Sequence, residues 1–94
     1  MKKYYVIGGQ YCSYLAGEAD TIREAKGIAE EHVTYGDNWA GWLVPSIYDA
    51  CDVEPCENFF GAQYCPKFGA LPRWEGKCDS DGNVKWSYLG GGLR

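Results

Sequence analysis

Long hydrophobic runs are missing from this sequence of 94 residues. No apolar stretch approaches the roughly 20 residues of a membrane-spanning helix, so no membrane association is expected. The opening residues, MKKYYVIGG, carry positive charge but no apolar segment of about 7–15 residues, so no secretory signal is expected. Basic residues are also few, because 9 Lys and Arg stand against 13 Asp and Glu, a net charge of −4. Domains that bind nucleic acid directly are usually basic, and direct nucleic-acid binding is therefore not expected.

Recognisable catalytic motifs are missing as well. The single histidine, His32, falls at or just past the end of a predicted helix, where positive charge favours the helix dipole. Nothing in the sequence brings a cysteine to it as a nucleophile. The pair Gly8–Gly9 matches no phosphate-binding motif, and residues 79–83 lack the glycine and glutamate spacing of a calcium loop. We therefore predict a non-enzymatic protein with no catalytic residues and no cofactor.

The sequence contains five cysteines: Cys12, Cys51, Cys56, Cys65 and Cys78. An odd number without an export signal favours reduced thiols in a cytosol over a disulfide framework. Structural zinc sites present their ligands in closely spaced pairs. Cys51 and Cys56 lie at the edge of that spacing, and Cys65 and Cys78 are too far apart to form a second pair. We predict five free thiols and no metal site.

Apolar residues make up 46% of the chain and aromatic residues 16%, which excludes a disordered protein. Strand-like residues at 4–7 and 10–15 flank Gly8–Gly9 and form either one bulged strand or a hairpin. Thr21 and Glu24 have the spacing of a capping box. The helix that they begin has one apolar stripe, formed by Ile22, Ala25, Ile28, Ala29 and Val33. Residues 34–42 read as a loop, and Pro45 precedes a predicted strand over 46–53.

The clearest β pattern lies near the C-terminus, where residues 73–78 and 83–88 alternate between two faces. A loop ending at Gly82 predicts a hairpin that pairs Trp74 with Tyr88, Gly76 with Trp86 and Cys78 with Val84. Residues 54–71 are expected to be irregular and to wrap the core without joining the sheet. We predict one α+β domain over residues 1–94, with one amphipathic helix packed on a small, mostly antiparallel sheet. The Gly-rich tail 90–94 is expected to be flexible.

Acidic residues gather in one part of the chain. Residues 18–57 contain ten acids and two bases, a net charge of −8, whereas the remainder carries +4. One interpretation is a solvated face that keeps the domain soluble. The other is a surface complementary to a basic partner, with aromatic residues as anchors. The residues that we assign to partner binding are Glu24, Glu30, Glu31, Tyr35, Asp37, Trp39 and Trp42.

Three short stretches resemble small proteins of phages and prophages from Gram-positive bacteria. They are Gly8-Gly9-Gln10-Tyr11, Asp37-Asn38-Trp39 with Gly41-Trp42, and Pro45-x-Ile47-Tyr48. In size, acidity and lack of motifs the chain also resembles the anti-CRISPR proteins. That resemblance implies a cytoplasmic protein of a bacterial host that inhibits a basic nucleic-acid-binding protein, such as the CRISPR effector Cas9. The inhibitor would cover a nucleic-acid-binding or PAM-reading surface, or block a conformational change.

Two other classes of function stay open at this point. The cysteines leave room for a small cytosolic enzyme or a cysteine-based metal-binding domain. A self-assembling phage accessory protein is the third interpretation.

Overall fold

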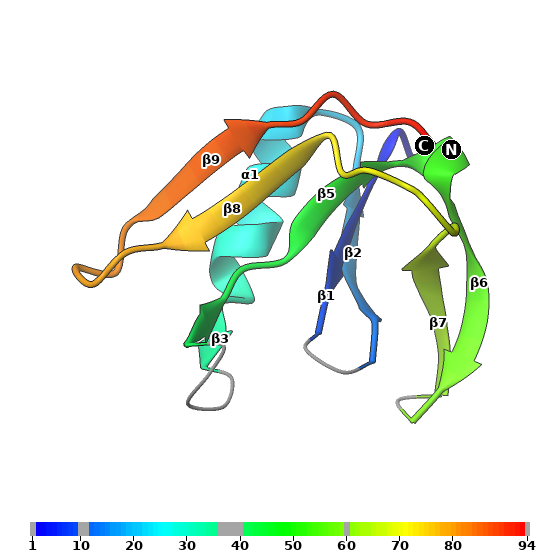
Figure 1. Cartoon of the computed structure of the whole chain (residues 1–94), viewed down its shortest axis with the longest axis horizontal. Coiled ribbons are helices and arrows are strands. Elements are labelled where there is room, and N and C mark those ends of the chain that lie inside the picture. Colours follow the sequence, from blue (N-terminus) through cyan, green and yellow to red (C-terminus); the bar gives the residue numbers. More distant parts are fainter. Residues whose placement is uncertain (1, 10–11, 36–40, 60, 94) are drawn as a thin grey trace.

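A five-stranded antiparallel sheet forms the centre of the computed structural model, which describes residues 2–9, 12–35, 41–59 and 61–93 (Figure 1). The strand order is β2-β1-β5-β8-β9, with β1 at Tyr4–Gly8, β2 at Tyr14–Ala19, β5 at Ser46–Asp49, β8 at Trp74–Cys78 and β9 at Val84–Tyr88. Helix α1, Ile22–Glu31, packs on β1, β2 and β5. The prediction of an α+β fold with one helix on a mostly antiparallel sheet is confirmed.

The helix begins where the capping box predicts. The backbone N–H of Glu24 donates to Oγ1 of Thr21 at 3.1 Å, which satisfies one of the free donors of the first turn. Ala25 and Ala29 are fully buried, and their small side chains bring the helix close to the sheet. They form the core with Val6, Ala19 and Ile47. Within the described residues, no helix combines the length and apolar character needed to cross a membrane.

The C-terminal hairpin has the predicted register. Trp74 pairs with Tyr88, Gly76 with Trp86 and Cys78 with Val84, while Gly82 has the positive φ, +86°, that its turn requires. At the other end of the sheet, β1 and β2 pair as an antiparallel hairpin, with a register shift between Val6 and Ile7. Of the two alternatives for the N-terminal strands, the hairpin is the one that forms.

The sheet opens at Pro45. Strands β5 and β8 pair only at Ile47 and Trp74 among the described residues, and continuing that register would place Pro45 opposite Gly76. Proline has no N–H to donate, so the ladder ends there. The chain before Pro45 turns away from β8 and forms a short ribbon of β3, Thr34–Tyr35, and β4, Trp42–Leu43. The ends of the predicted 34–42 loop are therefore paired strands.

Residues 50–66 correct the sequence reading in two places. The predicted strand over 46–53 ends at Asp49 and gives way to a 3-10 turn, Ala50–Asp52. Strands β6, Val53–Asn58, and β7, Gly61–Pro66, then form a regular ribbon in a stretch that we expected to be irregular. The ribbon stays outside the main sheet, as predicted, and Tyr64 packs edge-on against Tyr5 at 5.0 Å.

Residues 90–93 are packed into the fold, whereas the sequence predicts a flexible tail. The N–H of Gly92 donates to Oδ2 of Asp52 at 2.9 Å, and its carbonyl accepts from Leu71 at 2.8 Å. Leu93 forms a bridge with Ala70. Gly90, Gly91 and Gly92 all have positive φ, so the glycines let the chain follow this path. Asp52, only 5% exposed, is held by this contact.

Candidate protein-binding site

One end of the molecule brings together the last turn of α1, the β3–β4 ribbon and the turn between β8 and β9 (Figure 1). The helix ends at Glu31, and β3 begins three residues later at Thr34. Most of the sequence-predicted binding residues belong to this end. We call it the helix-end site and define it by Glu30, Glu31, Tyr35, Trp42 and the groove described below.

Tyr35 and Trp42 face each other across the β3–β4 ribbon. Their rings meet edge to face with centroids 5.1 Å apart, and they are 59% and 54% exposed. Cross-strand aromatic pairs hold each other in place and stabilise a ribbon. Large aromatic side chains that are already ordered are typical anchors of protein interfaces, because little side-chain entropy is lost when they bind.

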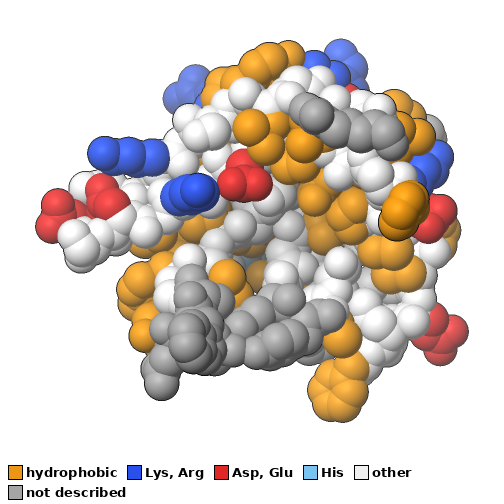
Figure 2. Space-filling view, viewed as in Figure 1, with side chains coloured by type: hydrophobic (Ala, Val, Ile, Leu, Met, Phe, Trp, Pro, Cys, Tyr) orange, Lys and Arg blue, Asp and Glu red, His pale blue; other side chains and the backbone are white. Residues whose placement is uncertain are grey.

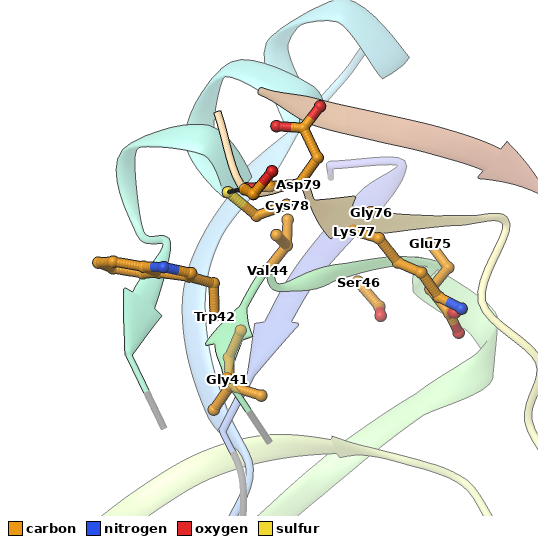
Figure 3. Close-up of a pocket in the computed structure, with 11 residues that line it drawn as sticks. Gly41, Trp42, Val44, Ser46, Glu75, Gly76, Lys77, Cys78 and Asp79 are labelled. Atoms are coloured by element: carbon orange, nitrogen blue, oxygen red, sulfur yellow. Dashed lines mark hydrogen bonds between the residues drawn. The ribbon is translucent and has the colours of Figure 1, made fainter. Parts of the chain in front are cut away.

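A groove of about 560 Å³ lies between β4 and β8, where Pro45 ends the ladder (Figure 3). Its lining comprises Gly41, Trp42, Leu43, Val44, Ser46 and residues 75–80. Val44 packs against β8, because a Cβ added to Gly76 would lie 2.7 Å from its Cγ1. Figure 3 shows the Trp42 indole at one side of the groove and Glu75 and Lys77 at the other. In the space-filling view this face is hollowed, and charged side chains of both signs lie at its edge (Figure 2).

The backbone of β8 is open along this groove. Asp79 donates its N–H to the carbonyl of Asn83 on the β9 side. Peptide groups alternate between the two edges of a strand, so those of Gly76 and Cys78 are directed toward the groove. No strand within the described ranges pairs with β8 there beyond Trp74. An open edge of this kind accepts an extended peptide as an added strand.

A second, smaller hollow of about 390 Å³ lies on the other side of the β8–β9 turn. It is lined by Glu30, Val33, Gly82, Asn83 and Val84. The last turn of the helix therefore stands beside a recess that ends in the hairpin turn. The two hollows give the helix-end site a concave outline on both sides of that turn.

Three acidic residues of the predicted binding site lie on the helix, and two of them accept hydrogen bonds from side chains of the fold. Glu24 accepts a hydrogen bond from the Thr21 hydroxyl at 3.2 Å and belongs to the cap. Glu30 accepts one from Nε1 of Trp86 at 3.1 Å, although its side chain is exposed. Glu31 is exposed and has no hydrogen bond or ion pair with any described residue. The predicted binding residues Asp37 and Trp39 lie outside the residues that the structure describes.

Three of the remaining acids of residues 18–57 contact other segments of the fold. Asp20 pairs with Lys2 at 3.2 Å. Asp49 accepts a hydrogen bond from Nε of Arg73 at 3.1 Å and raises the pKa of that guanidinium. Asp52 is buried on the Gly92 amide. These three carboxylates therefore hold distant segments of the fold together, which the sequence alone could not reveal.

The histidine and the cysteines considered in the sequence analysis can also be located in the structure. His32 closes the helix, with Nδ1 2.9 Å from the carbonyl oxygen of Ile28. All five cysteines are free thiols in the structure. Across the described ranges, no group of three or more His, Cys, Asp or Glu residues is placed to hold a metal ion. No family model, curated protein or solved structure matches the chain.

Proposed function

We propose that this protein is a non-enzymatic inhibitor that binds a larger, basic, nucleic-acid-handling protein. The specific candidate is a CRISPR effector nuclease such as Cas9, loaded with its guide RNA. The observation that carries the proposal is the exposed Tyr35–Trp42 pair beside an open groove and the acidic end of α1. The net charge of −4 and the resemblance to anti-CRISPR proteins favour a basic partner.

The residues of the helix-end site would act in different ways. Glu31 is exposed and adds negative charge, which would speed the encounter with a basic surface. Trp42 would insert into a pocket of the partner and slow dissociation. The open edge of β8 at Gly76 and Cys78 would pair with an extended segment of the partner. Bound in this way, the protein would cover a surface that the partner needs for nucleic acid.

Binding kinetics with the guide-loaded effector test the two side chains separately. Trp42→Ala should raise the dissociation rate about 30-fold, as for an interface hot spot. Glu31→Lys should mainly lower the association rate, and the difference should shrink in high salt because exposed charges are screened over about 8–10 Å. Matched controls are Phe68→Ala, an exposed aromatic elsewhere, and Glu57→Lys, an exposed acid on β6. Both controls should bind like the wild type.

Three outcomes would contradict the proposal at different levels. No binding and no inhibition with representative effectors would remove the nuclease assignment. Binding that tolerates both Trp42→Ala and Glu31→Lys would remove the helix-end site. Hydrogen exchange of the β8 amides tests strand addition, and the amide of Lys77 serves as the control within the same strand. The partner should protect the amides of Gly76 and Cys78 more than that of Lys77, which faces β9 in the register; equal protection would exclude strand addition.

A further inference from the structure

Two cysteines lie side by side on the β6–β7 ribbon. In the register of this ribbon, Cys56 is opposite Gln63 and Glu54 is opposite Cys65. Residues two apart on one strand share a face, so Cys56 and Cys65 are diagonal neighbours on the same face. The Cys56 thiol lies near enough to Cys65 to raise the pKa of the Cys65 thiol. Both side chains are half-buried, so small molecules can reach them.

Both strands of the ribbon that carries this pair are hydrogen-bonded to the chain just before and within β2. Oε1 of Gln63 accepts from the N–H of Leu15 at 2.9 Å, and Nδ2 of Asn58 donates to the carbonyl of Ser13 at 2.8 Å. Figure 1 shows β6 and β7 on the side of the molecule opposite the β8–β9 turn. A chemical modification of these two thiols would therefore not block the helix-end site.

The two thiols are not equivalent. The hydrogen bond with Cys56 and, secondarily, burial raise the pKa of Cys65 to about 11. Cys65 therefore keeps its proton at neutral pH and acts as a donor toward the sulfur of Cys56. Because the thiolate is the attacking form of cysteine, we expect Cys56 to take the first step within this pair.

We propose that Cys56 and Cys65 form a reversible modification site, which small-molecule disulfides such as oxidised glutathione convert into an intramolecular disulfide. The Cys56 thiolate attacks one sulfur of the reagent, its S–S bond breaks, and one half leaves as a thiolate. Cys65 then loses its proton to solvent and attacks the Cys56 sulfur, and the second half leaves. The protein loses two electrons and two protons, and the reagent becomes two thiols.

Two of the other cysteines, Cys51 and Cys78, contact oxygen atoms of the residues next to them. The thiol of Cys51 is exposed and directed to Oδ1 of Asp52 at 3.6 Å. The thiol of Cys78 is directed to the carbonyl of Asp79 at 3.7 Å. The bridge itself requires the two sulfurs of the pair to approach to about 2.05 Å.

Peptide mapping of the intact protein tests the proposal directly. Combined cleavage after glutamate and before aspartate places each of the five cysteines in a different peptide. Cys56 lies in residues 52–57, because the bond between Glu54 and Pro55 resists cleavage, and Cys65 lies in residues 58–75. After treatment with oxidised glutathione, these two peptides should be linked, and the thiol count should fall by two for that bridge. Reduced dithiothreitol should restore both thiols. Exposed Cys51 should carry a glutathione adduct and no bridge.

Single variants separate the two steps. In Cys65→Ser, the reaction should stop with glutathione on Cys56, whereas Cys51→Ser should leave the bridge unchanged. Circular dichroism of each variant checks that the fold is retained. The proposal is overturned if the wild type accumulates a stable glutathione adduct on Cys56 without bridging, or if bridges to Cys12, Cys51 or Cys78 form as fast as the 56–65 bridge.

Discussion

Trp86 offers a direct test of how the C-terminal hairpin joins the helix. Its ring covers Gly76, where an added Cβ would come within 3.0 Å of it. The indole N–H donates to Glu30 at 3.1 Å, and Nζ of Lys26 lies 5.8 Å from the ring centroid. Trp86 is half-buried and packs against the core cluster. One side chain therefore links β9, β8 and α1.

Two substitutions of Trp86 should separate the contribution of ring packing to stability from that of the hydrogen bond. Replacing a buried Trp by Ala costs about 3–5 kcal/mol, and partial exposure places Trp86→Ala near the lower end, about 3 kcal/mol. Trp86→Phe keeps most of the ring but loses the N–H donor, and water can still reach the Glu30 carboxylate, so its cost should be about 1 kcal/mol. Lys85→Ala, on the outer face of β9, should stay within about 0.5 kcal/mol.

Urea denaturation followed by circular dichroism measures these differences as shifts in midpoint at constant slope. A double-mutant cycle with Glu30→Ala and Trp86→Phe isolates the hydrogen bond, whose coupling should be about 0.5–1 kcal/mol at this exposed position. If Trp86→Ala and Trp86→Phe lower the free energy of unfolding equally, ring packing is not the main contribution of Trp86 to stability. A Lys85→Ala variant as unstable as Trp86→Ala would refute the inward orientation of Trp86.

Three further outcomes can be measured on the isolated protein. Gly76→Ala should lower the free energy of unfolding by about 1–3 kcal/mol in urea, because the new Cβ overlaps Val44; an unchanged midpoint would contradict this packing. Asp52→Ala should cost about 1–3 kcal/mol by leaving the Gly92 N–H without its acceptor, and retained stability would show that this contact is dispensable. In iodoacetamide labelling at pH 8, Cys65 should react far more slowly than an ordinary thiol, since its raised pKa of about 11 leaves little thiolate; rapid alkylation would exclude that shift.

Local patterns gave the most reliable sequence predictions. The capping box at Thr21 and Glu24 acts within one turn, and the hairpin register follows from alternation around Gly82. The β6–β7 ribbon was missed because Pro55 and Cys56 interrupt the usual β-branched pattern of a strand. Gly61, with φ of +91° just after the turn, is the local signal that could have identified it.

Contacts between distant residues account for what the sequence could not predict at the candidate site. Nothing local indicates that Glu30 meets Trp86, 56 positions further along the chain. Asp49 and Asp52 looked like members of an acidic surface, but Arg73 and Gly92 engage them in the folded chain. Charge counts along a sequence cannot distinguish a free carboxylate from one already used within the fold.

The opening of the sheet at Pro45 also bears on how the protein avoids self-association. An unpaired strand edge on the outside of a molecule is a template for aggregation. Here the open edge of β8 lies inside a groove, with β4 as its opposite wall. An edge that faces an opposite wall is less accessible to the sheet edge of another globular protein than an edge on the outside of a molecule. Pro45 thus leaves the backbone of β8 unpaired at a place where β4 limits access to it.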